Sequence, residues 1–378
     1  MDSSFPEVKK YFGFGCMRLP MKDGNVDLPQ FEDMVDLFLE NEFNYFDTAH
    51  GYLDGKSELA IHDGLTSRYP RDRYILTDKL TEPYFQKQED IRPFFEKQLE
   101  WCGVDYFDFY LMHAQGSTNY EKFQRCHAYE TAFELKKEGK IKHVGISFHD
   151  KATVLDRILT DHPEIEIVQI QFNYLDYEDA SVESRKVYEV ARKHQKPLLV
   201  MEPVKGGTLA NLPDGAQKVY DALNKKNGTQ HSNASYAIRF AAGFDGIRMV
   251  LSGMSTLDQM KDNISYMKDF QPLNDEEEEA IQEVTHVFQS LEMIPCTACH
   301  YCVEENHCPK KILIPDLFAC MNKKKITEDW NMNFYYNSVL TVNNGKASDC
   351  IRCGMCEKVC PQHLPIRDLL KQVAQEFE

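Results

Sequence analysis

The chain has 378 residues, of which 60 are acidic and 43 are basic, so its formal net charge is −17 at pH 7. Apolar residues make up 42% and aromatic residues 12%, which excludes a disordered chain and leaves ample side chains for a core. The acidic balance speaks against nucleic acids and anionic membranes as partners, because binding to phosphates requires clustered Lys and Arg. The length fits one large domain with a small appendage, or two medium domains.

The sequence shows no sign of export or of membrane insertion. Residues 1–18 contain no basic segment followed by an apolar stretch, so no signal peptide is visible. A run of about 18 consecutive apolar residues is also missing, so no transmembrane helix is expected. In a chain that we therefore expect to be cytoplasmic, 12 cysteines indicate metal or cofactor ligands before disulfides.

From residue 11 to about residue 270, short apolar stretches alternate with amphipathic segments. Several stretches are dense in β-branched and aromatic residues and are bounded by polar loops, which is typical of buried parallel strands. The predicted strands are Phe12–Gly15, Tyr45–Thr48, Tyr74–Thr77, Phe107–Met112, His143–Phe148, Ile165–Phe172, Pro197–Met201 and Ile247–Ser252. The predicted helices between them include Phe31–Glu40, Gln88–Cys102, Phe123–Lys137 and Val182–His194.

These strand–helix units recur at a spacing of roughly 30 residues, which predicts right-handed crossovers and a parallel sheet. About eight units over about 260 residues favour a closed (β/α)8 barrel. An open doubly wound sheet is the alternative. Its dinucleotide fingerprint, G-x-G-x-x-G, fails here because Gly13 and Gly15 supply two glycines but Arg18 stands at the third position.

The composition changes near Asn274. An acidic helix is predicted over Glu276–Ser290, and it is followed by Pro295 and the first of two cysteine runs. Almost all of the acidic excess lies before residue 291. We therefore predict a barrel domain over residues 1–290 and a small module of helices and loops over residues 291–378.

Eight cysteines form two runs in this module, Cys296-x2-Cys299-x2-Cys302-x5-Cys308-Pro309 and Cys350-x2-Cys353-x2-Cys356-x3-Cys360-Pro361. The second run has the spacing and the terminal Cys-Pro of bacterial ferredoxins, whereas the first has two extra residues before its last cysteine. Three closely spaced thiolates suit one 4Fe-4S cluster, and in two-cluster ferredoxins the fourth ligand comes from the other run. Applied here, one predicted ligand set is Cys296, Cys299, Cys302 and Cys360, and the other is Cys350, Cys353, Cys356 and Cys308.

Structural zinc is the alternative interpretation of these runs, since two C-x-x-C pairs suffice for it. Three cysteines at successive x2 spacing, found twice and each time closed by Cys-Pro, exceed what zinc requires. We therefore predict two 4Fe-4S clusters in a ferredoxin-like module. The remaining cysteines are expected to be buried packing thiols; they are Cys16, Cys102, Cys126 and Cys320.

Functional residues of a (β/α)8 barrel lie at the carboxyl ends of its strands. The sequence places Asp47 and Tyr52 after the second predicted strand, Lys79 after the third and His113 after the fourth. Each of them alone could be a cap or a loop residue, but their joint occurrence favours a functional site.

The chemistry of this group is coherent. A tyrosine with an ordinary pKa of about 10 is a poor acid at neutral pH unless a nearby cation favours the phenolate. Lys79 can supply that charge, held in place by Asp47, and His113 can donate a hydrogen bond to a carbonyl oxygen that gains negative charge. Such a group protonates a carbonyl oxygen while hydride reaches its carbon, and it runs backwards to oxidise an alcohol.

Four segments look like those of the aldo/keto reductase family in order, spacing and placement: Gly13–Leu19, Phe46–Tyr52, Leu111–His113 and Lys137–Ser147. The resemblance covers about residues 10–270. It implies an NAD(P)(H)-dependent barrel with a catalytic tetrad, which here is Asp47, Tyr52 as the acid/base, Lys79 and His113. The cysteine-rich module resembles that of the branch of the family with a C-terminal ferredoxin-like domain.

The resemblance also implies contacts with a nicotinamide cofactor. Ser147 matches the family's serine near the nicotinamide amide, and Phe148 stands where the family has Asn. Gln169 matches the glutamine that binds the carboxamide.

The segment over residues 252–263 matches the family's adenosine-phosphate loop. Its implied contacts are Gly253, Ser255, Gln259 and Asn263. Members that prefer NADPH often carry a basic residue where Gly253 and Gln259 stand, so we expect weak preference for NADPH and favour NADH. Lys261 is a nearby cation that could contribute to binding of the 2′-phosphate.

The predicted function is reversible hydride transfer between a nicotinamide and a carbonyl or alcohol. A hydride carries two electrons and each cluster passes one, so direct exchange would need a converter such as flavin, and no flavin motif is visible. The clusters are therefore either structural or oxidation-sensing, or they relay electrons to or from a ferredoxin or flavoprotein partner. A third hypothesis, a redox-sensing scaffold that uses its barrel only for binding, is disfavoured by the intact tetrad.

Overall fold

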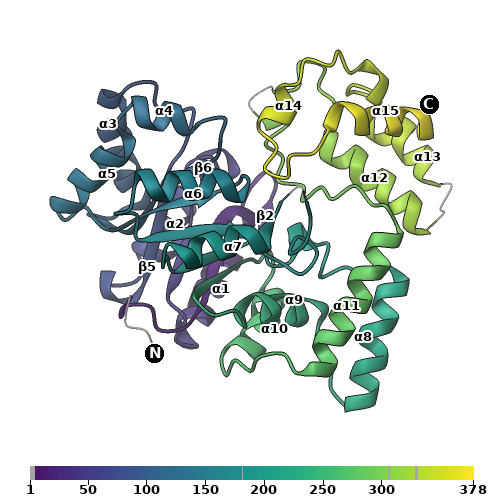
Figure 1. The fold of residues 1–378 in the computed structure, drawn as a ribbon, viewed down its shortest axis with the longest axis horizontal. Coiled ribbons are helices and arrows are strands. Elements are labelled where there is room, and N and C mark those ends of the chain that lie inside the picture. Colours follow the sequence, from purple (N-terminus) through teal and green to yellow (C-terminus); the bar gives the residue numbers. More distant parts are fainter. Residues whose placement is uncertain (1–4, 181, 305–306, 328–330) are drawn as a thin grey trace. The chain divides into compact units, whose positions relative to one another are not determined.

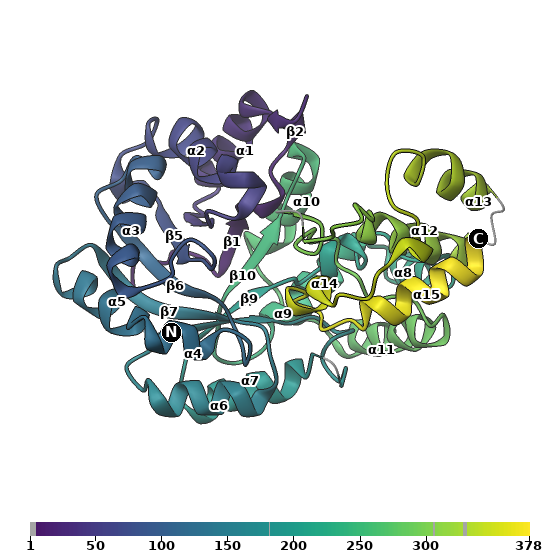
Figure 2. The ribbon, with the colours of Figure 1, turned by 90° about the horizontal axis from the view of Figure 1, so that it is seen from above.

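The computed structural model describes residues 5–180, 182–304, 307–327 and 331–378. Eight parallel strands close into a barrel in the order β1-β10-β9-β8-β7-β6-β5-β4, and β4 pairs with β1 (Figure 2). This arrangement confirms the predicted (β/α)8 barrel and excludes the open sheet. The barrel strands are β1 (Phe12–Gly15), β4 (Tyr45–Asp47), β5 (Ile75–Leu80), β6 (Phe107–Gln115), β7 (Ile141–Phe148), β8 (Ile167–Gln171), β9 (Leu198–Met201) and β10 (Ile247–Gly253).

Helices follow the strands and cover the outside of the barrel (Figure 1). They are α1 (Leu28–Glu40), α2 (Lys56–Ile61), α3 (Gln88–Cys102), α4 (Tyr120–Arg125), α5 (Ala128–Lys137), α6 (Ala152–Asp161), α7 (Ser184–Lys193), α9 (Asn233–Ala242) and α10 (Leu257–Met267). A small antiparallel hairpin of β2 (Met21–Lys22) and β3 (Asn25–Val26) precedes α1.

The prediction of one helix over Phe123–Lys137 was wrong. The structure has two helices there, α4 and α5, and His127 between them has the left-handed dihedral φ of +50°. A left-handed residue cannot continue a right-handed helix, so the chain turns at this point. The amphipathic pattern runs across the break because both helices bury an apolar face.

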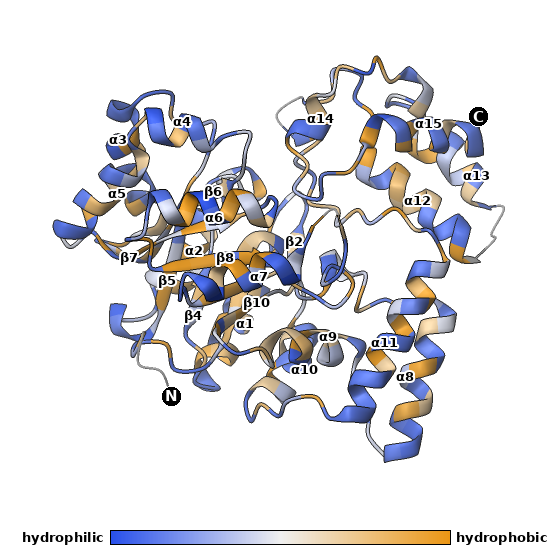
Figure 3. Cartoon of the chain, viewed as in Figure 1, coloured by the Kyte–Doolittle hydropathy of each residue, from blue (hydrophilic) through white to orange (hydrophobic). Residues whose placement is uncertain are grey.

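The barrel interior is filled by alternate residues of its strands. The most central of them form one cluster in which every member is at most 5% exposed: Tyr45, Ile75, Phe109, Leu111, Ile167, Leu199, Met249 and Leu251. Gly145 of β7 leaves room for this packing, since a Cβ on it would lie 2.5 Å from Ile167 Cγ2 and 2.8 Å from Leu111 Cδ2. The strands are accordingly rich in apolar residues, while the outer helices show both apolar and polar residues (Figure 3).

By their internal contacts, the residues fall into two compact units. The first comprises Met1–Asp179, Glu183–Pro203 and Ala234–Leu273, and the second comprises Ala180–Val182, Val204–Asn233 and Asn274–Glu378. The second unit thus contains α8 (Asp214–Asn227) and α11 (Asp275–Ser290), which pack side by side, as well as the cysteine-rich tail. The functional division at residue 290 stays a prediction.

The predicted acidic helix after Asn274 is α11. Asn274 and Glu277 form a reciprocal capping box, with the Asn274 side chain accepting from the Glu277 amide and the Glu277 carboxylate accepting from the Asn274 amide, both at 3.0 Å. Acidic residues over 275–278 occupy the first turn, where the helix dipole favours negative charge. The cap and the charges explain why the helix begins at this composition change.

The tail adds α12 (Ile314–Thr327), α13 (Asn331–Tyr335), α14 (Met355–Lys358) and α15 (Ile366–Phe377) to the second unit. Its core is small and lies between these helices and the cysteine runs. The most deeply buried members are Leu317, Phe318, Tyr336 and Val373, each 0% exposed. Within the described residues, no helix is long and apolar enough to cross a bilayer.

Candidate active site and cysteine centres

Four polar side chains meet at the carboxyl ends of β4, β5 and β6. Asp47 ends β4, Lys79 is the penultimate residue of β5, and His113 lies in β6, while Tyr52 begins the short helix η2 (Tyr52–Gly55). Lys79 Nζ donates to Asp47 Oδ1 at 2.7 Å and to the Tyr52 hydroxyl at 3.1 Å. The rings of Tyr52 and His113 contact edge to face with 5.9 Å between centroids. The structure therefore brings together the four residues predicted for the tetrad.

The period of the strands explains why these side chains converge. Residues two apart on a strand face the same side, so Asp47 continues the inward row begun by the core residue Tyr45. By the same spacing, Lys79 continues the row from Ile75, and His113 continues the row from Leu111. Each strand is apolar in the middle of the barrel and polar at its carboxyl end, which is where barrel enzymes carry their active sites.

The Lys79 ammonium is fully buried, with 0% exposure, and its three donors are all used. Besides Asp47 and Tyr52, the carbonyl oxygen of Thr48 accepts from Nζ at 2.7 Å. A buried ammonium is tolerated only when it is paired and hydrogen-bonded in this way. Lys79 is thereby fixed against the Tyr52 oxygen.

Burial decides the protonation of the other three residues. Burial holds the pKa of Tyr52 well above its ordinary value, and the Asp47 carboxylate raises it further, so Tyr52 holds its proton at neutral pH. Burial raises the pKa of Asp47, which the Lys79 ammonium opposes. Burial and the Lys79 charge hold the pKa of His113 well below its usual range, so its imidazole is neutral. The site thus holds a protonated phenol beside a neutral imidazole and an ion pair.

Thr81 orients His113. Its Oγ1 lies 2.7 Å from His113 Nδ1, the ring nitrogen that is fixed by this bond. A hydroxyl that donates to Nδ1 leaves the imidazole proton on Nε2. In that tautomer Nε2–H is a donor.

The two residues predicted to contact the nicotinamide lie next to this group. Ser147 of β7 is in parallel register with Gln169 of β8, and both continue inward rows of the barrel. Gln169 Nε2 donates to Asp47 Oδ2 at 3.4 Å, and Ser147 Oγ lies 3.4 Å from His149 Nε2. Ser147 and Gln169 therefore belong to the same polar end of the barrel as Asp47.

The loop after β10 is held by hydrogen bonds within the segment 252–263. Ser255 N donates to Gln259 Oε1 at 2.7 Å, and Asn263 Nδ2 donates to Ser252 Oγ at 2.9 Å. Thr256 caps α10 by accepting from the Gln259 amide at 3.2 Å. Gly253, Ser255, Gln259 and Asn263 are thus brought together at one strand end and one helix N-terminus, a setting that suits an anion.

Arg18 is a candidate that the sequence interpretation missed. It follows β1, whose Gly15 is in register with Gly253 of β10. A Cβ on Gly253 would lie 3.3 Å from Arg18 Cβ, and the Arg18 carbonyl accepts from Ser255 Oγ at 2.8 Å. Arg18 also forms an ion pair with Glu202 at 3.6 Å. In a closed barrel the first and last strands are neighbours. This rule could have predicted from the sequence that Arg18, after the first strand, lies beside the loop that follows the last strand.

The eight cysteines of the two runs gather around two small cavities. One cavity is lined by Cys308, Cys350, Cys353 and Cys356. The other is lined by Cys296, Cys299, Cys302 and Cys360. Each cavity thus combines three cysteines of one run with the last cysteine of the other, and Ile314 borders both.

The donor sets fit 4Fe-4S clusters. Burial and the neighbouring Cys299 and Cys296 raise the pKa of Cys302, while burial, Glu357 and Cys350 raise the pKa of Cys356 to about 11. Thiols crowded in this way ionise together when a metal cation compensates their charge. Four sulfurs per cavity, with the last one exchanged between the runs, match the ligand count and the pattern of a two-cluster ferredoxin. The lone Cys16, Cys102, Cys126 and Cys320 are all buried, and none of them lines either cavity.

Comparison with known proteins agrees with this architecture. The model of the aldo/keto reductase family matches residues 12–286, and that of a 4Fe-4S dicluster domain matches residues 295–365. Because the first match spans most of the chain, the protein belongs to the aldo/keto reductase family. It is an oxidoreductase of that type with a 4Fe-4S domain after the barrel.

The relatives are distant in sequence. An NADH-specific methylglyoxal reductase of Escherichia coli (strain K12) is 22% identical over 273 residues, which cover 61% of this chain and 81% of that protein. A glyoxal reductase of Bacillus subtilis (strain 168) is 31% identical over 138 residues, or 36% of this chain and 45% of that protein. A 4-dihydromethyl-trisporate dehydrogenase of Mucor mucedo is 26% identical, and the match covers 44% of this chain and 57% of that protein.

Solved structures share the barrel. The holo form of an aldo-keto reductase from Bacillus halodurans has a TM-score of 0.58 and 25% identity, and the match covers 72% of this chain and 91% of that one. A Klebsiella pneumoniae aldo-keto reductase in complex with NADPH has a TM-score of 0.60 and 19% identity, with 73% of this chain and 90% of that one covered. The second likeness establishes the fold alone.

Proposed function

We propose that the protein catalyses reversible, NAD(P)(H)-dependent reduction of a carbonyl compound, with Asp47, Tyr52, Lys79 and His113 as its catalytic tetrad. The observation that carries this proposal is the buried Lys79 ammonium, which contacts both the Asp47 carboxylate at 2.7 Å and the Tyr52 hydroxyl at 3.1 Å. This geometry stabilises negative charge on the Tyr52 oxygen at the moment its proton leaves.

The tetrad residues have separate roles in this mechanism. When bound, a nicotinamide would supply the hydride for the carbonyl carbon. The neutral His113 donates from Nε2 to the carbonyl oxygen and orients it, and Tyr52 transfers its proton to that oxygen to give the alcohol. Lys79 balances the charge left on Tyr52, while Ser147 and Gln169 would hold the carboxamide of a bound nicotinamide. In the oxidative direction, Tyr52 takes the proton back.

Small aldehydes and 2-oxoaldehydes are the proposed substrate class. Two of the relatives are named as an NADH-specific methylglyoxal reductase and a glyoxal reductase. The assay is anaerobic consumption of NADH with methylglyoxal as the probe, followed by identification of the alcohol. Consumption of NADH that depends on the carbonyl is the expected result. If NADH is oxidised only in the presence of an electron carrier, the carbonyl reductase function is wrong.

NADH is the proposed preferred cofactor. Lys261 forms an ion pair with Asp258 at 3.7 Å, which reduces its capacity to bind a 2′-phosphate. Arg18, which contacts the same loop, pairs with Glu202 at 3.6 Å. Titration of tryptophan fluorescence with NADH and with NADPH gives the two dissociation constants. The proposal expects comparable values or tighter binding of NADH, and strong selectivity for NADPH contradicts it.

Residues 291–378 are proposed to form a separate functional domain that holds two 4Fe-4S clusters, beside a barrel domain over residues 1–290. The two complete sets of four sulfurs around separate cavities support this assignment. Iron and acid-labile sulfide, measured on anaerobically purified protein, are expected at about eight of each per chain, as two 4Fe-4S clusters require. Bound zinc without acid-labile sulfide would contradict the assignment of 4Fe-4S clusters to these cysteines.

Electron relay is a second candidate function for these clusters. Cys353 is exposed, whereas the other ligand cysteines are buried or partly buried, so one cluster would lie near the surface and within reach of a ferredoxin or flavoprotein. The absorbance of the iron–sulfur centres, recorded while NADH is added anaerobically, distinguishes electron relay from a structural role of the clusters. Bleaching without a further partner supports electronic coupling, and an unchanged spectrum favours a structural role. A cytoplasmic location is proposed with either function.

A further inference from the structure

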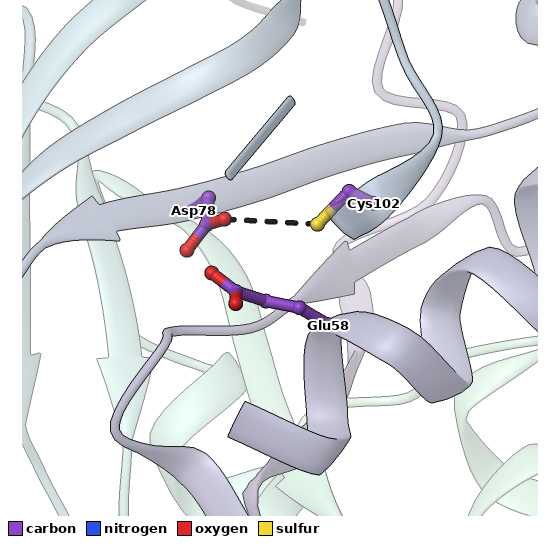
Figure 4. A group of neighbouring side chains, drawn as sticks. All are labelled: Glu58, Asp78 and Cys102. Carbon is purple, nitrogen blue, oxygen red and sulfur yellow. Dashed lines mark hydrogen bonds between the residues drawn. The ribbon is translucent and has the colours of Figure 1, made fainter. Parts of the chain in front are cut away.

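A second group of buried polar side chains lies directly behind Lys79. Glu58 of α2, Asp78 of β5 and Cys102 at the end of α3 are each 0% exposed, and their polar atoms lie within 4.8 Å of one another (Figure 4). Because side chains alternate along a strand, Asp78 points to the opposite face of β5 from Lys79. Cys102 Sγ donates to Asp78 Oδ2 at 3.7 Å. The group therefore lies between β5 and the helices, outside the tetrad.

This group binds both main-chain polar atoms of Lys79. The Lys79 amide donates to Asp78 Oδ1 at 2.7 Å, and the Lys79 carbonyl accepts from Gln98 Nε2 at 3.1 Å. Gln98 Nε2 also donates to Glu58 Oε1 at 3.1 Å, and the Tyr110 hydroxyl fixes the amide by donating to Gln98 Oε1 at 2.6 Å. The position of Lys79, and hence of its ammonium, depends on these bonds.

The two carboxyls cannot both be ionised. Two buried negative charges at this separation repel strongly unless a cation lies between them. The Lys79 ammonium lies on the other face of β5, where it is bonded to Asp47. Burial and the Glu58 charge raise the pKa of Asp78 well above its ordinary value, and burial raises the pKa of Glu58 to about 7. Above neutral pH, the pair is therefore left with one proton.

A bound metal ion is a poorer interpretation of the same residues. Each of the four carboxyl oxygens already accepts from a protein group: Glu58 Oε1 from Gln98 and Oε2 from His50, and Asp78 Oδ1 from the Lys79 amide and Oδ2 from Cys102. A neutral thiol that donates to a carboxyl is consistent with the observed contact.

His50 connects the pair to the surface. Its Nδ1 lies 2.6 Å from Glu58 Oε2, its side chain is 19% exposed, and its ring stacks on Trp101 at 4.4 Å. Burial lowers the pKa of His50, so the ring is neutral and Nδ1–H donates to the carboxylate. The titratable and charged groups that face the pair are thus His50, Cys102, Tyr110 and Lys79.

We propose that Glu58 and Asp78 share one proton behind Lys79, act as its positioning residues and, through His50, link the acidity of Tyr52 to the pH of the solvent. The shared proton itself does not depend on the proposed function, but its effect on the reaction rate rests on the proposed carbonyl reduction. Because the remaining proton is shared, part of the negative charge that appears when the pair ionises rests on Asp78, and negative charge on Asp78 raises the pKa of Tyr52. When rising pH ionises the pair, a negative charge appears behind the tetrad and Tyr52 becomes a weaker acid. Carbonyl reduction should therefore slow as pH rises through about 7.

Infrared difference spectroscopy tests the shared proton without turnover. At about pH 8 the wild-type protein should show the carbonyl stretch of a protonated, buried carboxyl, and Asp78→Asn should lack it. An equally strong band in Asp78→Asn, or its absence from the wild type, overturns the inference. Because this readout needs no substrate, it stands even if the carbonyl reductase function fails. Loss of a stoichiometric metal other than iron in Asp78→Asn would also contradict the shared proton.

The pH dependence of kcat tests the kinetic consequence. Glu58→Gln should lose the decline near pH 7, while Glu277→Gln, the same change at a buried capping glutamate of α11, should keep it. Asp78→Leu should lower kcat by about ten-fold more than Asp78→Asn, since the amide retains an acceptor for the Lys79 N–H. Retention of the wild-type pH profile in a folded Glu58→Gln variant contradicts the proposed link.

Discussion

The two units of this protein assemble their functional groups by different means. In the barrel, Lys79 is held by three acceptors supplied by the protein itself, so the tetrad is complete through its own contacts. In the second unit, four cysteines line each of two cavities, burial raises the pKa of Cys302 and Cys356 among them, and a metal cluster would supply the positive charge that their thiolates need. Substitutions in the tetrad should therefore lower catalytic activity more than they lower the free energy of unfolding. Substitutions of the cluster cysteines should lower the free energy of unfolding of the second unit first.

The largest effect is expected from Tyr52→Phe. This change removes only the hydroxyl that contacts Lys79 at 3.1 Å, so the barrel should stay folded while the proton donor is lost. We expect kcat to fall by about 10²- to 10⁴-fold. Steady-state kinetics with methylglyoxal and fluorescence titration with NADH measure the two effects. An unchanged kcat would contradict the role of Tyr52 as proton donor, and loss of NADH binding would contradict the claim that the substitution leaves the barrel intact.

Cys302→Ser should affect the second unit rather than the barrel. Cys302 is 7% exposed and lines one cavity, so its loss should remove one cluster and about half of the iron. Cys320→Ser is the matched control, because Cys320 is 4% exposed in the same core but lies outside both runs. Iron and sulfide analysis with thermal unfolding compares them. Full iron content in Cys302→Ser contradicts its role as a ligand.

A smaller effect is expected from Gly206→Ala in the short helix η5 (Lys205–Gly207). Gly206 has a φ of +62°, and a Cβ on it would lie 2.3 Å from the carbonyl oxygen of Thr297, which stands between Cys296 and Cys299. The substitution should displace that loop and weaken the cluster bound there. Gly215→Ala, in α8 of the same unit, is the control because its Cβ would meet only a side-chain atom, Val287 Cγ1, at 3.2 Å. Equal iron retention in both variants refutes this prediction.

The smallest effect is expected at Lys261. Its ion pair with Asp258 is largely exposed, with side chains 59% and 95% accessible, and pairs of this kind contribute about 0–1 kcal/mol. Lys261→Ala should therefore change the ratio of the NADH and NADPH dissociation constants by less than about five-fold. A larger loss of NADPH affinity would show that this side chain recognises the 2′-phosphate.

The sequence predicted the barrel because buried parallel strands carry a local signal. The stretch Phe107–Met112 and the helix Gln88–Cys102 both appear at the expected places, the latter with identical bounds. Asp47, Lys79 and His113 could be selected since each follows an apolar stretch. The same alternation that makes a strand visible also fixes which of its residues point into the site.

Contacts between distant segments could not be predicted in this way. Arg18 lies beside Gly253 only because the barrel closes, and Gly206 meets Thr297 only after the second unit folds. The pairing of Glu58 with Asp78 joins a helix to the outer face of a strand. Such contacts depend on tertiary packing, for which a single sequence has no local pattern.

Transfer of label from deuterated NADH tests the central claim most directly. NADH that carries deuterium at the transferred position is incubated anaerobically with methylglyoxal, and the product is examined by mass spectrometry for the wild type and for Tyr52→Phe. The account predicts a deuterated alcohol from the wild type and almost none from the variant. An unlabelled alcohol from the wild type, or equal labelling by both proteins, would contradict direct hydride transfer assisted by Tyr52.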